Sequence, residues 1–130
     1  MSSDNVKIPE EYLNNLPLSA IVVKDDQESL NHEVVFVNRQ FIKEMGYTNE
    51  DIPDKNTWWV TAYPDKDYQK VVAQQWELTV ELYNPNESNY IAMEANICTK
   101  HHGTVRYKVY SEASDHLIPG HYIVMFSKMA

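Results

Sequence analysis

Short apolar runs separated by polar turns mark the strand-forming parts of the chain. Residues 20–24 read Ala-Ile-Val-Val-Lys, and residues 33–37 read Glu-Val-Val-Phe-Val. β-branched and aromatic residues fit the pleated surface of a sheet, so both runs predict strands. The polar stretch 25–32 between them has the composition of a hairpin loop.

The last third of the chain alternates apolar and polar residues, which is the pattern of a half-buried strand. In residues 90–100 the positions expected to face inward are Ile91, Met93, Ala95 and Ile97, and Glu94 is expected to face outward. A turn at Gly103 leads into a second alternating run, residues 105–109, and a turn at residues 119–120 leads into a third, residues 122–126. We therefore expect a three-strand meander.

In the middle of the chain the apolar period changes from two to about 3.6, which predicts helices. Asn38 is placed to cap a first helix, and Gly46 to end it in the left-handed conformation. Thr48 followed by Asp51 resembles a capping box and predicts a second short helix, which Pro53 ends early.

Pro64 and Asp65 predict the start of the longest helix. Its apolar stripe comprises Tyr68, Val72, Trp76, Val80 and Tyr83. A further short helix is expected near the N-terminus, where Tyr12, Leu13 and Leu16 share a helical face and Pro17 ends the pattern. We treat residues 1–18 as a helical lead-in and residues 19–130 as the domain.

This order of elements predicts an α+β domain. Two strands at the start and three at the end can join into one antiparallel sheet, with the intervening helices on one face. Such an arrangement leaves a concave apolar space between sheet and helices, where small ligands are usually held. The 130 residues, 43% of them hydrophobic, suffice for one core.

Charge and cysteine content narrow the partners and the compartment. The formal charge is -8 and the basic residues are scattered, which argues against a nucleic-acid partner, because phosphate binding needs clustered Lys and Arg. The single cysteine, Cys98, fits a reducing compartment. No apolar run approaches the ~20 residues of a membrane-spanning helix, and residues 1–15 lack a signal-peptide core. We expect a cytoplasmic protein.

Three groups of residues, taken in order, carry a family resemblance. They are the strand-Asn-x-x-Phe entry from Val35 to Phe41, the Gly-Tyr-Thr corner within Met45 to Pro53, and Trp58-Trp59 followed by Ala62-Tyr63-Pro64-Asp65. The series continues into Tyr68, Trp76 and the turn Gly103-Thr104-Val105-Arg106. Over about residues 17–127 the chain resembles the PAS sensor family, the sensory-box domains of bacterial histidine kinases and diguanylate cyclases.

The resemblance implies the PAS fold for residues 19–130, with a five-stranded antiparallel sheet and with short helices and one long helix covering one face. It also implies a sensory input module that binds a small molecule, forms a homodimer and relays the signal to an output domain in the same protein. Two segments depart from the family's pattern. His101-His102-Gly103 stands where Lys-Asp-Gly is usual, and Ser127-Lys128-Met129 replaces the Asp-Ile-Thr relay motif.

A set of apolar and aromatic side chains is expected to line the ligand pocket: Phe36, Phe41, Met45, Trp59, Tyr63, Trp76, Met93, Tyr107 and Met125. Aromatic residues at helical spacing also fill cores, so core packing remains the alternative for each of them. Structural duties at caps and turns are expected for Asn38, Gly46, Pro64, Asp65 and Gly103.

The cofactor, if any, is left open. Haem held by a histidine of the long helix is not expected, because residues 67–83 contain no His. Flavin photochemistry of the kind known in this superfamily needs a reactive Cys on a helix, whereas Cys98 falls on the polar face of a predicted strand. No metal site is expected, because the histidines fall in loops and strand ends: His32, His101, His102, His116 and His121.

No catalytic residues are predicted, because the chain has no nucleophile elbow, no phosphate-binding Gly loop and no zinc-binding helix motif. Two alternatives to ligand sensing stay open. A small cone-shaped α+β enzyme, such as an isomerase or hydratase, would need a buried carboxylate, and Glu94 would have to supply it. A ligand-free protein-interaction module would fill the pocket with its own side chains.

Overall fold

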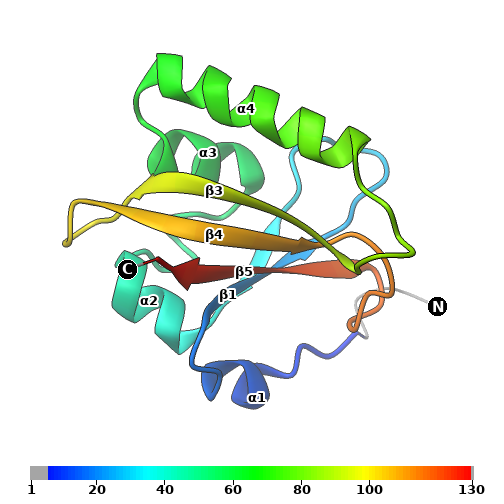
Figure 1. Ribbon diagram of the computed structural model, residues 1–130. Helices are drawn as coiled ribbons and strands as arrows, with labels where there is room; N and C mark the ends of the chain where they lie inside the picture. Colours follow the sequence, from blue (N-terminus) through cyan, green and yellow to red (C-terminus); the bar gives the residue numbers. More distant parts are fainter. Residues whose placement is uncertain (1–5, 130) are drawn as a thin grey trace.

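The computed structural model describes residues 6–129 of the chain (Figure 1). Within these residues the chain forms four helices and five strands, and α4 is the longest helix. In chain order the elements are α1 (Glu10–Asn14), β1 (Ser19–Lys24), β2 (Val34–Val37), α2 (Arg39–Met45), α3 (Lys55–Ala62), α4 (Lys66–Glu81), β3 (Tyr90–Cys98), β4 (Thr104–Glu112) and β5 (His121–Lys128).

All five strands form one antiparallel sheet in the order β2-β1-β5-β4-β3. The last strand, β5, lies in the middle of the sheet, between β1 and β4. β1 and β5 pair along the whole length of β1, from Ser19 opposite Phe126 to Lys24 opposite His121. The sheet therefore depends on the joining of the two ends of the domain.

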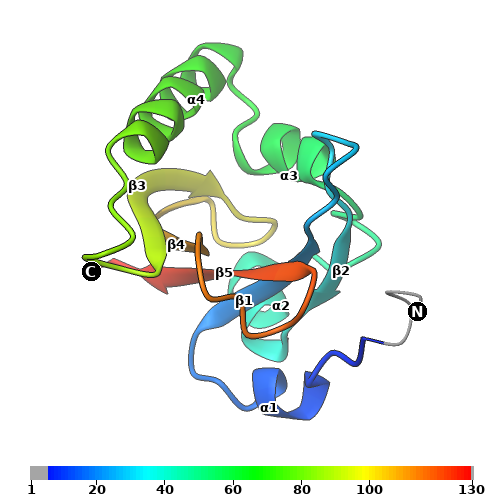
Figure 2. The ribbon, with the colours of Figure 1, turned by 90° about the vertical axis from the view of Figure 1, so that its right-hand side faces the viewer.

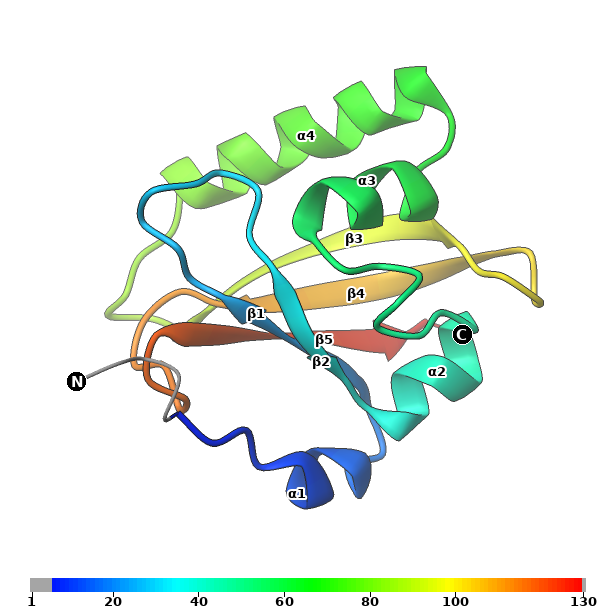
Figure 3. The same ribbon diagram turned by 180° about the vertical axis from the view of Figure 1, so that it is seen from behind.

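Three helices contribute to the main core, on the face of the sheet that carries Ile21, Met93 and Tyr107. Figures 2 and 3 show α3 and α4 lying together over this face. The short helix α1 lies on the opposite side, where Leu13 packs against Val22 and Ile123 in a second, smaller cluster. The expectation that the intervening helices share one face is met, and the lead-in helix covers the other.

The alternation of β3 places its residues as the sequence predicts. Met93, Ala95 and Ile97 are buried in the main core. Glu94 points outward, where it forms an ion pair of 3.4 Å with Arg106 of β4.

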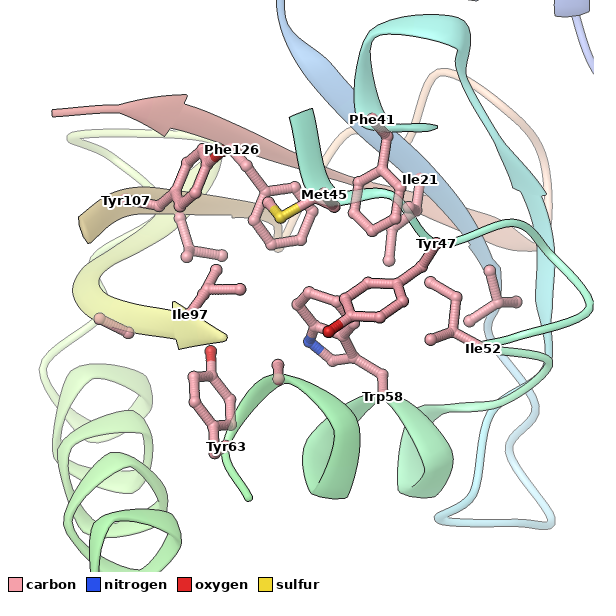
Figure 4. Close-up of a cluster of buried hydrophobic side chains, with 14 of the residues drawn as sticks. Ile21, Phe41, Met45, Tyr47, Ile52, Trp58, Tyr63, Ile97, Tyr107 and Phe126 are labelled. Carbon is pink, nitrogen blue, oxygen red and sulfur yellow. The ribbon is translucent and has the colours of Figure 1, made fainter. Parts of the chain in front are cut away.

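A group of aromatic rings packs together in the core near the end of β5 (Figure 4). Phe126 of β5 lies 5.5 Å from Phe41 of α2 and 5.4 Å from Trp58 of α3, measured between ring centroids. Tyr107 of β4 meets Phe126 edge-on at 6.4 Å. Tilted and edge-on pairs of this kind add to the stabilisation from burial alone.

Asn38 is a fully buried polar residue that connects three elements. Its Oδ1 accepts hydrogen bonds from the backbone N–H groups of Phe41 and Ala20, both at 2.9 Å. Its Nδ2 donates to the carbonyls of Leu13 and Leu18, both at 2.8 Å. Asn38 thus caps α2, where the sequence predicts a cap, and also ties that helix to α1 and β1.

The segment before Trp58 differs from the sequence-based expectation. Thr48 and Asp51 do bond to each other, through the Thr48 N–H and hydroxyl, but they close only a turn. The short helix predicted before Pro53 is therefore absent. Helix α3, which the sequence analysis did not predict, begins after Pro53 at Lys55, where Asp54 accepts a bond of 2.8 Å from the N–H of Thr57. Pro53 accounts for the missing helix, because proline disfavours helical geometry at the residue before it.

The α1 stripe also differs. Leu13 is buried and Leu16 packs beside it, but Tyr12 is 68% exposed. A five-residue helix is too short to bury three positions of its stripe.

We expect Asn38→Ala to lower the free energy of unfolding by about 3 kcal/mol or more, because it leaves three buried backbone groups and one part-buried carbonyl without their partner. Denaturant unfolding measures the change. Asp65→Ala is the matched control: Asp65 caps α4 at an exposed site, so its loss should cost about 1 kcal/mol. Equal effects of the two substitutions would contradict the connecting role of Asn38.

Substitutions at Gly46 and Gly103 separate two costs of adding a side chain: the strain of a positive φ and the steric clash of the new Cβ. Both are left-handed, with φ of 85° and 68°. A Cβ at Gly46 would lie 2.7 Å from Cβ of Lys100, whereas a Cβ at Gly103 would meet nothing within 4 Å. We expect Gly46→Ala to destabilise by about 2–3 kcal/mol and Gly103→Ala by only about 1 kcal/mol. Thermal unfolding that ranks them the other way would refute this assignment.

Candidate functional site

A cavity of about 570 Å³ lies between the sheet and helices α3 and α4. This volume is within the range of cavities that hold small molecules. Residues from all five strands form its floor, and residues from α3 and α4 form its roof.

The roof is largely aromatic. Trp58 and Trp59 come from α3 and Trp76 from α4. Tyr63, in the turn between these helices, meets Trp59 in a tilted pair with ring centroids 5.1 Å apart. The apolar floor is supplied by Ile21, Val23, Val34, Ile91, Met93, Val109 and Val124. The apolar body of a ligand would gain free energy by leaving water for this space.

The polar part of the wall comes from the β1–β2 loop, the start of α3, the end of β4, the β4–β5 segment and the start of β5. It comprises Asp25, His32, Lys55, Ser111, Glu112, His116 and Tyr122. Tyr122 joins several of these groups, because its ring lies 5.7 Å from His32 and 6.4 Å from His116 between centroids. The cavity wall therefore combines an aromatic surface with a cluster of ionisable groups.

Hydrogen bonds fix the proton positions of His32 and Tyr122. Nε2 of His32 lies 3.1 Å from the carbonyl oxygen of Asp26, which can only accept, so Nε2 carries the hydrogen. In the neutral ring Nδ1 must then accept, and the Tyr122 hydroxyl donates to it over 2.9 Å. Burial, with a smaller contribution from Asp25, raises the pKa of Tyr122, so this hydroxyl keeps its proton at neutral pH.

Glu112 is a buried carboxylate at the end of β4. Its Oε1 accepts from the N–H of Ile123 at 2.7 Å, and its Oε2 accepts from the N–H of Leu117 at 3.4 Å. Both oxygens are thus used to hold the segment between β4 and β5 against the sheet. This geometry suits a structural carboxylate better than a proton acceptor in catalysis.

Lys55, the first residue of α3, is half-buried in the cavity wall. Its backbone N–H donates to the carbonyl of His32 at 2.8 Å, which places the two residues side by side. Burial lowers the pKa of the Lys55 ammonium.

Four of the side chains expected to line the pocket do lie on the cavity wall: Trp59, Tyr63, Trp76 and Met93. Three others, Phe41, Met45 and Tyr107, are fully buried in the main core and belong to the packed interior away from the cavity. Burial and the charge of Glu44 raise the pKa of Tyr107 to about 12.

Phe36 and Met125 are not part of the cavity either. Both pack in the second cluster on the opposite face of the sheet, beside Val22 and Ile123. Met125 was expected to face the pocket. In β5, however, the residues that contact the main core are Tyr122, Val124 and Phe126. A shift of one residue in register reverses the face of every side chain.

The residues expected at caps and turns occupy those places. Asp65 caps α4 directly after Pro64, accepting from the N–H of Asp67 at 2.9 Å. Gly46 ends α2 in the left-handed conformation. Cys98 lies on β3 and is not among the residues that line the cavity.

Sequence reasoning missed the polar wall altogether. His32, Asp25 and Lys55 stand in segments that read as loops, and Glu112 follows the alternating run that the sequence marks as a strand. The one feature of the sequence that points to this polar wall is the presence of several ionisable residues beside the predicted strand ends. Within residues 6–129, no three His, Cys, Asp or Glu side chains gather closely enough to hold a metal ion. In the same part of the chain, no helix combines the length and apolarity needed to span a membrane.

Comparisons of sequence find no relatives: no protein-family model matches, and no curated protein does. Comparisons of structure do. The PAS domain of an HTR-like protein from Haloarcula marismortui matches with a TM-score of 0.59 and 14% identity, covering 92% of this chain and 88% of that one.

Two further structures support the same fold. The PAS domain of a LuxR-family transcriptional regulator from Burkholderia thailandensis, in complex with ethanol, matches with a TM-score of 0.62 and 10% identity, covering 95% of this chain and 98% of that one. The LOV protein of Rhodobacter sphaeroides matches with a TM-score of 0.61 and 9% identity over 93% of this chain. Our chain spans 65% of that protein's length.

These superpositions cover almost the whole chain and agree with the strand order and the helical cover described above. The chain has the PAS fold.

Proposed function

We propose that this chain is a PAS sensory domain, the input module of a bacterial signal-transduction protein such as a histidine kinase or a diguanylate cyclase. It binds a small molecule between sheet and helices and relays occupancy through a homodimer to an output domain in the same protein, in the cytoplasm. The observation that carries the proposal is the aromatic-roofed cavity of about 570 Å³ in a PAS fold. The dimer and the output domain rest on the family resemblance.

A ligand bound in the cavity would contact elements on both sides of it, so binding can affect the rest of the domain. A ligand in the cavity touches α3 and α4 on one side and the sheet on the other. It therefore stabilises whichever helix-sheet arrangement fits it best, and it can shift the protein only by its differential affinity for two arrangements. The ethanol complex of the LuxR-family PAS domain supports this use of the fold for a small molecule.

The two alternatives are less well supported. The enzyme hypothesis needed Glu94 inside the domain, but Glu94 lies at the surface in an ion pair with Arg106. The ligand-free interaction module needed a filled interior, and the aromatic rings fill only the part of it around Phe126.

We expect Val80→Trp to abolish retention of a copurified small molecule while leaving the domain folded. Val80 lines the cavity from α4 and is 45% exposed, so an indole there can enter the cavity without displacing core side chains. Native mass spectrometry of protein purified from cell extract measures the bound mass and the oligomeric state together.

Val71→Trp provides the matched control for that experiment. Val71 lies on the same helix, is 55% exposed and does not line the cavity, so this variant should retain the ligand. Loss of the bound mass in both variants, or no bound mass and no dimer in the unsubstituted chain, would count against the proposal.

A further inference from the structure

The cavity wall carries two acidic groups, one lysine and two histidines, and these differ in how well they are satisfied. The acidic groups are Asp25 and Glu112. Both oxygens of Glu112 accept backbone N–H groups, and Oδ1 of Asp25 accepts from the Gln27 amide at 3.2 Å. The charge of Glu112 is therefore stabilised on both oxygens by local donors, whereas Asp25 has one exposed donor on one oxygen.

Lys55 is the exception. No carboxylate oxygen of residues 6–129 lies within 4 Å of its Nζ, and within the same residues Nζ makes no hydrogen bond. Burial alone lowers its pKa, with no opposing charge acting on it. An ammonium that is partly removed from water without compensation gains most from an incoming anion.

Two neighbouring donors, His32 and Tyr122, are already committed. The Tyr122 hydroxyl donates to Nδ1 of His32, and Nε2 of that ring donates to the Asp26 carbonyl. Neither group has a proton left for a ligand while His32 is neutral. Of these three side chains, Lys55 is thus the donor that is free to recognise a ligand, and it carries the ammonium that an anion requires.

We infer that the ligand is an amphipathic carboxylate, whose anionic group pairs with Lys55 and whose apolar body lies against Trp59, Trp76 and Met93. The inference rests on the proposed ligand-binding function and specifies the chemical class of that ligand. The aromatic surface takes a flat or branched hydrocarbon body, and the single free ammonium takes one negative charge.

The opposite assignment, a cationic ligand held by the tryptophans, is disfavoured by the same charges. An amine in this cavity would face the unpaired ammonium of Lys55, and the Glu112 oxygens that could attract it are bound to backbone N–H groups. Asp25 would remain to favour it, so the two assignments have to be separated by measurement.

Three probes of one shape distinguish the charge classes: 2-naphthylacetate, the neutral 2-naphthylacetamide and the cationic 2-(2-naphthyl)ethylamine. Calorimetric or NMR titration of the full chain should rank the carboxylate first, roughly tenfold or more above the amide, because a charge-assisted hydrogen bond is worth more than a neutral one. Lys55→Met should remove this preference and leave the affinity for the amide unchanged.

Lys66→Met is the control for net charge. Lys66 is exposed at the start of α4 and does not line the cavity, so its loss should leave the ranking intact. A preference for the amine, equal binding of all three probes, or a carboxylate preference that survives Lys55→Met would overturn the inference. In each of these cases binding of the amide still supports a ligand cavity, whereas no binding by any probe counts against the proposed function as well.

A stability measurement gives an independent test on the ligand-free protein. A lysine whose pKa is lowered in the folded state destabilises it while charged, and this penalty disappears as pH rises above the folded-state pKa. We therefore expect Lys55→Met to leave the Tm unchanged or raise it at pH 7, with a smaller gain at alkaline pH. A lower Tm for this variant at pH 7 would show that Lys55 is already satisfied within the chain and would overturn the inference.

Discussion

The architecture depends on the pairing of the first strand with the last. β5 lies between β1 and β4 and bonds to both, so the N-terminal strand pair and the C-terminal meander become one sheet only through it. All three helices of the main face lie in the chain between these two halves. Closing the sheet therefore draws the helices over its face, and the space beneath them exists because this long-range pairing holds.

The interior under the helices is filled unevenly. Around Phe126, the rings of Phe41 and Trp58 pack within contact distance and leave a dry core. Toward the start of β5, the wall is made of Tyr122, His32 and Lys55, and here the cavity remains. The packed part supplies stability, which lets the hollow part be shaped for binding, since cavities reduce stability by the contacts they forfeit.

The polar side chains of the cavity wall also divide into those that hold the structure and one that is available for a ligand. Glu112 and His32 are occupied by the backbone and by Tyr122, and they hold the segments that border the cavity. Among residues 6–129 the Lys55 ammonium has no such partner, and it stands beside an aromatic surface. Under the proposed function, an anion that pairs with Lys55 would act on α3, while its apolar body would contact α4 and the sheet.

Local rules in the sequence were enough for the strands of the meander, the long helix and the conformations of Asn38, Gly46 and Asp65, because periodicity, capping and positive φ depend on neighbours a few residues away. They failed where distant segments decide. Phe36 and Met125 are side chains of the kind that line pockets, but they face the other side of the sheet. The short helix predicted from Thr48 is only a turn, and the helix α3, capped by Asp54, was not predicted. The polar wall could not be foreseen at all: His32, Lys55 and Tyr122 are far apart in the chain, and only the packing of α3 and β5 around the β1–β2 loop brings their side chains together.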